Sequence, residues 1–267
     1  MYGDLVLPSS RRLEIAGIPP GYTARRPHVD WPEPEDNHLL ARIIEADRGE
    51  ILPALEGVAL PPGLVLFEPG GPRPYVYFPT SGVVAMSNDL DNGVSTEIAL
   101  KGNESLVGSS VYMGGGTSPN RATVIAAGYA YRIRTAVLAK EFARNPVLKR
   151  LMLRFTQALI TQVAQTAVCI RHHTTEQRLC RLLLQILDRS TSNKIVITHE
   201  LIANMLGVRR EGITGIAGRL QADGLIDCRR GHITVLDRSK LEQRVCECYA
   251  VVKRESDRLL PDRPAAH

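Results

Sequence analysis

The sequence predicts an α+β fold with an N-terminal β-roll, a long helix and a C-terminal winged helix-turn-helix domain, and three observations predict it. Between residues 58 and 134, short apolar segments alternate with turns rich in Gly and Pro, as in a small β-roll. From 146 to 173, apolar residues recur at helical spacing. Residues 197–236 then have the pattern of a helix, a glycine turn, a second helix and a basic hairpin.

The N-terminal segment, residues 1–36, contains six prolines and scattered charges without sustained periodicity. We therefore expect a flexible tail, with a contact of Trp31 onto the body as the alternative. The roll domain is expected over 37–145. It should begin with a helix over 38–46 that Asn37 caps, followed by a second short helix over 48–55. Within the roll, residues 91–93 (Asp-Asn-Gly) predict a hairpin turn.

The long helix over 146–173 is predicted to be a dimerisation helix. Two apolar stripes run along it, so one can face the roll and the other a partner helix; a buried helix in a monomer is the alternative. The second stripe contains Leu153, Ile160, Val163, Ala167 and Ile170. The first has the 4-3 spacing of a heptad seam, and we assign it to a homodimer interface made of Leu148, Met152, Phe155, Leu159, Gln162, Thr166 and Cys169.

A DNA-binding domain with an additional C-terminal helix is expected over 174–257. Thr198 can cap the first helix of the motif, and Gly207 can end it where the chain turns. The second helix, about 209–223, starts with the basic and polar residues that such a helix presents to base edges, and the hairpin turn adds two arginines. The candidate DNA-binding residues are Thr198, Arg209, Arg210, Glu211, Thr214, Arg229 and Arg230. The alternative is a surface helical hairpin with solvated charges.

The segment "ITHELIANMLGVRREGITGIAGRLQADGLI" resembles the winged-helix domain of the Crp/Fnr superfamily of bacterial transcription regulators, and the resemblance extends over roughly 37–237. It implies a cyclic-nucleotide-binding-like β-roll and a homodimer that binds a palindromic site in double-stranded DNA; an activator would also contact RNA polymerase. Family members read their half-site with an Arg, the Glu after it and a second Arg four residues later. The first two match Arg210 and Glu211, whereas the third falls on Gly215.

The same resemblance places an effector pocket at the loop over 106–122. In the family this loop cradles the cyclic nucleotide phosphate; Gly108 and Arg121 match its Gly and Arg, but Ser109 stands where the ribose-binding Glu is expected. The positions that contact adenine are Val163 and Ala164, which cannot make those bonds. We therefore expect a small-molecule effector other than cyclic AMP, or an Arg121 that only ties the loop to a carboxylate. The candidate pocket residues are Gly108, Ser109, Ser110, Arg121 and Ala122.

Other functional classes are not expected. No His lies between His38 and His172 and no Cys precedes Cys169, so neither catalytic residues nor a cofactor such as haem or an iron–sulfur cluster is predicted. Because the His172–His173 pair and the Cys246-x-Cys248 pair each lack further ligands, no metal is expected either. No apolar run of 18 residues and no signal peptide are evident, which predicts a cytoplasmic protein without a membrane partner.

The net charge of +5 is modest, but the stretch from Thr174 onward has 16 Lys and Arg against 12 Asp and Glu, an excess of four. A basic C-terminal part fits nucleic acid as the partner. The predicted function is a dimeric, sequence-specific DNA-binding transcription regulator with an effector-sensing roll. Two alternatives stay open: a regulator that binds DNA without a ligand, and a cyclic-nucleotide-sensing scaffold that binds protein partners.

Overall fold

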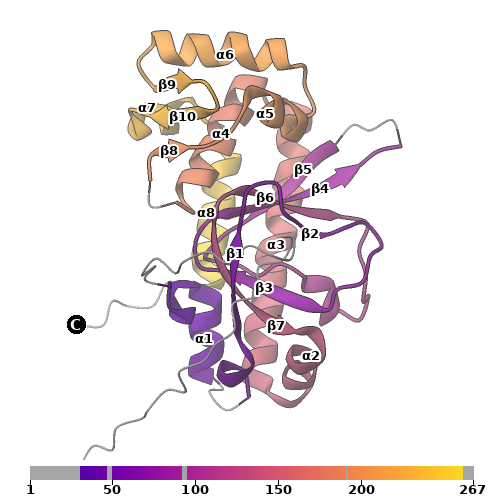
Figure 1. Cartoon of the computed structure of the whole chain (residues 1–267). Helices are drawn as coiled ribbons and strands as arrows, with labels where there is room; N and C mark the ends of the chain where they lie inside the picture. The colour runs from indigo at the N-terminus through magenta and orange to yellow at the C-terminus, as the bar shows by residue number, and fades with distance from the viewer. Residues whose placement is uncertain (1–30, 47–49, 92–94, 191, 261–267) are drawn as a thin grey trace, which may run out of the picture.

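The computed structural model describes residues 31–46, 50–91, 95–190 and 192–260. It confirms the α+β fold, with antiparallel sheets in the N-terminal part, one long helix and a C-terminal helix-turn-helix (Figure 1). The predicted tail up to residue 30, the central residues of the turn over 91–93 and the last seven residues lie outside the described residues. Among the helices described, each is too short or too polar to cross a lipid bilayer.

The segment before the roll is tied to it. The Trp31 ring packs edge-on against Tyr129, with ring centroids 4.7 Å apart, and the Tyr131 hydroxyl donates to the Pro32 carbonyl at 2.9 Å. After a 3-10 turn η1 (Pro34–Asp36), helix α1 (His38–Ala46) begins where predicted, because the Asn37 side chain accepts the Leu40 N–H at 2.8 Å. The end of the expected tail is therefore ordered.

The second predicted helix, over 48–55, is wrong in its described part. Only a 3-10 turn η2 (Leu52–Ala54) forms there. Pro53 lies inside this segment and has no amide hydrogen to give to a continuing α-helix, so a single turn is followed directly by the first strand.

The roll is made of two antiparallel sheets. One has the strand order β1 (Glu56–Leu60), β7 (Gly128–Arg134), β3 (Tyr75–Pro79). The other has the order β2 (Val65–Phe67), β6 (Arg121–Ala126), β4 (Val83–Asp89), β5 (Ser95–Lys101). Apolar side chains fill the interior: Val58, Leu60, Phe67, Val84, Val107, Ala122, Val124 and Ala130. The roll thus has a packed interior of its own, against which the loop before β6 is held.

Two helices leave the roll. Helix α2 (Thr135–Arg144) is followed at once by α3 (Pro146–His172), whose start is capped by the Asn145 side chain accepting the Val147 and Leu148 N–H groups. Helix α3 runs along the roll to the C-terminal domain, and the last helix, α8 (Cys248–Leu259), packs against it (Figure 1).

The assignment of the heptad seam to the dimer interface is corrected by the burial of its residues. Within a single chain, the seam side chains other than the half-buried Leu159 are already covered: Leu148, Met152, Phe155, Gln162, Thr166 and Cys169. Met152 and Phe155 belong to the same apolar core as α1 and β3, and the Gln162 amide donates to the Leu100 carbonyl on β5. The stripe that faces outward is the second one, with Leu153, Ile160 and Ile170 at 53%, 62% and 44% exposure.

The C-terminal domain contains α4 (Thr175–Leu187), α5 (His199–Leu206), α6 (Arg210–Ala222), α7 (Arg238–Arg244) and a small sheet of order β8 (Lys194–Ile195), β10 (His232–Val235), β9 (Ile226–Arg229). Its core is continuous with apolar side chains of the roll, namely Val83, Ala85, Leu100 and Ile125. The single helix expected after the hairpin is instead two helices, α7 and α8, separated at residues 245–247.

Candidate nucleic-acid interface and effector pocket

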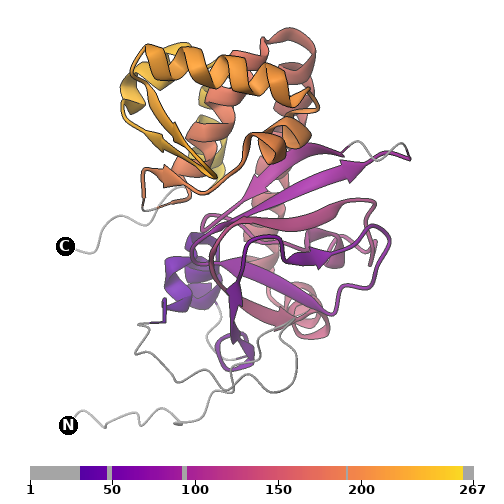
Figure 2. The same cartoon turned by 45° about the horizontal axis from the view of Figure 1, so that its top comes forward.

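The helix-turn-helix has the local geometry that its sequence predicts. The Thr198 hydroxyl accepts the Leu201 N–H at 3.1 Å and so caps α5. Gly207 ends this helix with φ +63°, a backbone conformation that residues with a Cβ rarely adopt. Helix α6 then packs Ile213, Ile216 and Leu220 into the domain core. Its opposite face lies at the end of the molecule away from the roll (Figures 1 and 2).

This outer face of α6 carries the residues predicted to read bases. Arg210, Glu211 and Thr214 are exposed on its first turns, next to the exposed Arg209. The Arg210 guanidinium makes only a long contact, with Nε 3.9 Å from Glu200 Oε2 on α5, and the Thr214 hydroxyl donates to the Arg210 backbone carbonyl at 3.1 Å. The Arg210 guanidinium and the Glu211 carboxylate are therefore available to a partner that approaches this face.

Three glycines extend the outer face along the helix. A Cβ placed on Gly212, Gly215 or Gly218 would meet no atom within 4 Å, so these positions open directly to solvent. Each glycine inside a helix costs about 1 kcal/mol relative to alanine. Gly215, where the resembling family has its second arginine, thus leaves a smooth surface without a side chain.

The hairpin forms the expected wing beside α6. Strands β9 and β10 pair with Arg229 opposite His232, and Gly231 closes the turn with φ +80°. Arg229 pairs with Asp227 at 2.9 Å but stays 71% exposed, and Arg230 is exposed at the tip. The structure therefore brings both predicted wing arginines to the surface.

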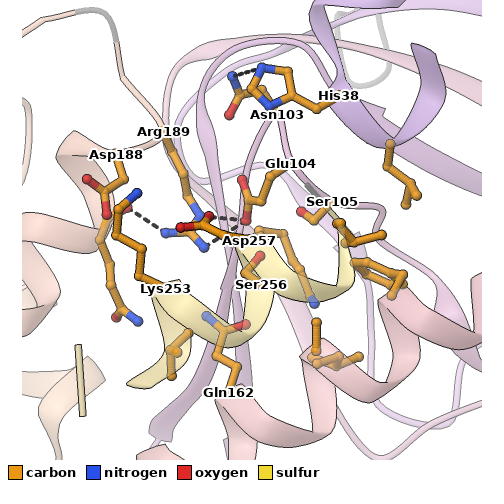
Figure 3. A pocket seen from close by; sticks show the side chains of 18 of the residues that line it. His38, Asn103, Glu104, Ser105, Gln162, Asp188, Arg189, Lys253, Ser256 and Asp257 are labelled. Atoms are coloured by element: carbon orange, nitrogen blue, oxygen red, sulfur yellow. Dashed lines mark hydrogen bonds and ion pairs between the residues drawn. The ribbon is translucent and has the colours of Figure 1, made fainter. Parts of the chain in front are cut away.

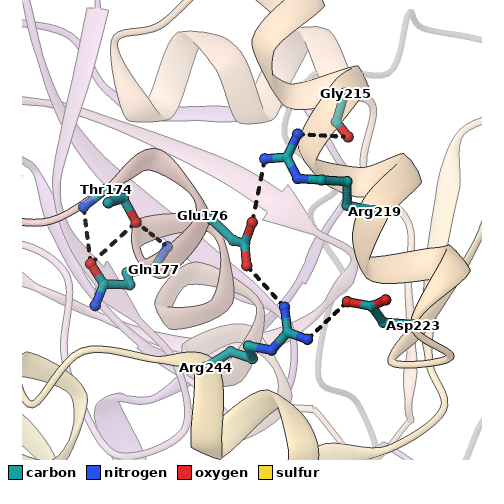
Figure 4. Close-up of polar contacts among 7 residues, drawn as sticks. All are labelled: Thr174, Glu176, Gln177, Gly215, Arg219, Asp223 and Arg244. Atoms are coloured by element: carbon teal, nitrogen blue, oxygen red, sulfur yellow. Dashed lines mark hydrogen bonds and ion pairs between the residues drawn. The ribbon is translucent and has the colours of Figure 1, made fainter.

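A bridge that the sequence analysis missed holds α6 in place. Glu176, in the first turn of α4, accepts Arg219 of α6 at 3.3 Å and Arg244 of α7 at 3.2 Å, and Arg244 also pairs with Asp223 at 2.8 Å (Figure 4). Next to it, Thr174 and Gln177 form the capping box that starts α4. The bridge links three helices, α4, α6 and α7, so no local sequence pattern could reveal it.

The effector loop has the expected backbone, but Arg121 is already paired. Gly108 has φ +114°, and a Cβ there would lie 3.4 Å from the Phe67 ring. Arg121 Nε lies 2.7 Å from Asp89 Oδ2 and its terminal nitrogen 3.2 Å from Glu68 Oε2. These two carboxylates already balance the positive charge that an anionic ligand would need. Of the remaining predicted pocket residues, Ser109 and Ser110 are half-buried in the loop and Ala122 lies inside the roll.

A second arginine, Arg73, faces the same loop from inside the roll. Its side chain is 6% exposed, stacks over the Phe67 ring at 4.4 Å and donates to the Ser118 and Asn120 carbonyls at 3.4 and 3.5 Å. Its Nε has no hydrogen-bond partner among the described residues, and burial lowers the pKa of the guanidinium. Sequence spacing gives no hint of this placement, because Arg73 lies outside the loop.

A cavity of about 180 Å³ opens between α1, α3, α4 and α8, away from the predicted pocket (Figure 3). Arg189 and Glu104 form an ion pair of 2.7 Å at its wall, and Gln162 projects from α3. Lys101 is buried there against Phe155, and this burial lowers the pKa of its ammonium group to about 7. Because the lining comes from separate elements, no sequence motif predicts the cavity.

Comparison with known proteins agrees with this architecture. Residues 177–244 match the family model of the Crp-like helix-turn-helix domain. A global nitrogen regulator of Synechococcus elongatus is 25% identical over 219 residues, which cover 78% of this chain and 97% of the relative. Among solved structures, FixK2 from Bradyrhizobium japonicum superposes with a TM-score of 0.61 at 16% identity, covering 72% of this chain and 98% of that one. A protein assigned to the Crp/Fnr family from Eubacterium rectale superposes with a TM-score of 0.60 at 20% identity, covering 73% and 91%.

A β-roll joined by a long helix to a Crp-like helix-turn-helix domain is the architecture of a DNA-binding transcription regulator. With its Crp-like domain and its similarity to a regulator along most of the chain, the protein resembles the transcription regulators of the Crp/Fnr family. The resemblance predicted from the sequence is thereby confirmed.

Proposed function

We propose that the protein is a homodimeric, cytoplasmic regulator that binds a palindromic DNA site by inserting one α6 into each of two successive major grooves. The observation that carries this proposal is the outer face of α6, where Arg210 and Glu211 are exposed and held by no strong partner. Arg can bond the O6 and N7 atoms of guanine, and Glu can accept from the N4 amino group of cytosine. The half-site should therefore contain a G·C pair that depends on these two residues.

The wing arginines have a different role in this proposal. Arg229 and Arg230 lie at the tip of a hairpin, where phosphate is the nearest feature of a duplex docked on α6.

The two kinds of arginine should therefore respond differently to substitution. Arg210→Ala should cost roughly 1–3 kcal/mol on the preferred site and flatten the preference at one base pair. Arg230→Ala should weaken all sequences alike and lower the salt slope by about one unit.

Binding to a randomised palindrome at two salt concentrations separates the two behaviours. Arg254→Ala, which removes an exposed arginine on α8, is the matched control and should change neither quantity. An unchanged base preference in Arg210→Ala would mean that α6 does not read bases in this register. The scaffold alternative, in which the protein binds other proteins, predicts no shift of any DNA fragment in a gel.

The dimer of this proposal is formed by the outward stripe of α3. Leu153, Ile160, Val163 and Ile170 are apolar and exposed on the face that points away from the roll. Exposed apolar side chains at helical spacing are typical of a helix that packs on a partner. Two-fold symmetry would pair the stripe with its own copy and place the two α6 helices about 34 Å apart, one turn of DNA.

The effector of the roll is proposed to be a small molecule other than cyclic AMP. Ser109 supplies no carboxylate, the Arg121 charge is met by Asp89 and Glu68, and Val163 is apolar. Any effector would act by binding the DNA-competent arrangement of the dimer more tightly than the other. A regulator that needs no ligand would show no thermal shift with cyclic mononucleotides, cyclic dinucleotides or fatty-acid derivatives. RNA polymerase would be a further partner if the protein activates transcription.

A further inference from the structure

Four potential metal ligands from two distant segments meet beside the end of α3. Cys169 and the C-cap residue His173 are four positions apart and so share one face of the helix. Cys246 and Cys248 lie at the break between α7 and α8. The three sulfur atoms and the nearest ring nitrogen of His173 all lie within 4.8 Å of one another. Each pair alone is too small for a metal site, but together they make a Cys3His set.

The distances within this cluster match a tetrahedral site. Zinc binds thiolate at about 2.3 Å and imidazole nitrogen at about 2.0–2.1 Å, so the edges of a tetrahedron are about 3.8 Å between two sulfurs and about 3.6 Å between sulfur and nitrogen. In the structure, Cys169 Sγ and Cys246 Sγ are 3.6 Å apart, and Cys248 Sγ and His173 Nδ1 are 3.6 Å apart. Two of the six edges therefore have the length that a zinc ion needs, and the other four are no longer than 4.8 Å.

The surroundings also suit a closed site. Cys169, Cys246 and Cys248 are 1%, 3% and 1% exposed. His173 turns Nδ1 toward the sulfurs and Nε2 toward the Glu247 carboxylate, 3.3 Å away. A carboxylate on the far nitrogen of a ligating imidazole fixes its tautomer and its orientation.

The charge of the cluster is balanced from α4. Three thiolates and one Zn²⁺ would leave a net charge of −1, and the buried Arg181 beside Cys169 would neutralise it. The Arg181 Nε has no hydrogen-bond partner among the described residues.

We propose that Cys169, His173, Cys246 and Cys248 bind one Zn²⁺ ion as a structural site that fastens the break between α7 and α8 to the end of α3. Binding displaces the three thiol protons to solvent, and no oxidation or reduction takes place. Since His173 ends α3 and Thr174 caps α4, the ion would fix the junction between the roll and the DNA-binding domain. This inference goes beyond the proposed function, because a metal-free regulator could still bind DNA through α6.

Metal analysis of the full chain, expressed without a histidine tag and purified under reducing conditions, tests the proposal. Elemental mass spectrometry is expected to find about one zinc ion per chain. His173→Ala and Cys248→Ser should lose it, whereas His172→Ala and Cys228→Ser, a neighbouring histidine and a cysteine of the wing, should keep it. Far-UV circular dichroism shows whether each variant is folded.

Co²⁺ supplied to the metal-free wild-type chain gives a second readout that needs no variant. Thiolate ligation in a tetrahedral site should produce intense d–d and sulfur-to-metal charge-transfer absorption, which Zn²⁺ then abolishes. The proposal is overturned by a reduced wild-type chain that binds no zinc and gives no such cobalt spectrum. It is equally overturned by iron as the bound metal, by a Cys169–Cys246 disulfide in peptide mass spectra of the reduced preparation, or by equal metal loss in the control variants.

Discussion

Ile160→Glu is expected to split the dimer and to leave each chain folded. The Ile160 side chain is 62% exposed on the outward stripe of α3. Full burial of an isoleucine stabilises by about 1.5–3 kcal/mol, so the exposed part contributes about 1–2 kcal/mol when a partner covers it. Two-fold symmetry doubles the loss to about 2–4 kcal/mol, and two like charges would face each other. The dimer should weaken by about two orders of magnitude or more.

Met152→Glu on the inner seam is the comparison. Met152 is fully buried in the core shared by α1, α3 and the roll. A carboxylate at this position would be buried without a partner of opposite charge, so the substitution should unfold the chain rather than split a dimer. Sedimentation at several concentrations, together with far-UV circular dichroism, distinguishes the two results. An Ile160→Glu protein that sediments as an unchanged dimer would refute the assignment of the outward stripe to the interface.

Three further outcomes are expected. Burial raises the pKa of Glu97 to about 7 from 4.5, against the charges of Arg181, Arg189 and Arg178, and Cys169 adds to the increase. The stability that the protonated Glu97 contributes is therefore fully present below about pH 4.5 and is lost as the pH rises through 7, by up to about 3 kcal/mol. Urea titrations at several pH values should show this decline in the free energy of unfolding, and Glu97→Gln should abolish it. Calorimetry should detect no binding of cyclic AMP at micromolar concentration, and saturable binding would show that the carboxylates beside Arg121 move aside. Glu176→Ala should lower the free energy of unfolding by about 1 kcal/mol, since Glu176 holds α6 and α7 to α4 through partly exposed ion pairs; chemical denaturation measures it.

Features that depend on neighbours in the chain could be predicted from the sequence alone. Asn37, Thr174 and Thr198 cap their helices by bonds to amides three positions away, and these side chains do so in the structure. Gly207 and Gly231 occupy turns with positive φ. Such contacts form whatever the rest of the molecule does, and the order of elements that they delimit was enough to predict the α+β fold and the resemblance.

Which surfaces meet was decided only by the tertiary structure. Both stripes of α3 are apolar, and the sequence cannot say which one the roll covers; packing with α1 and β3 buries the heptad seam and leaves Ile160 outside. Arg121 meets Asp89 and Glu68 because β4 and the loop after β2 flank β6. Cys169 and Cys246 are separated by 77 positions and become neighbours because α8 folds back along α3. Sequence periodicity shows that a helix face is apolar, and the sequence shows that a potential metal ligand is present. Which other residues that face or that ligand contacts depends on how the whole chain packs.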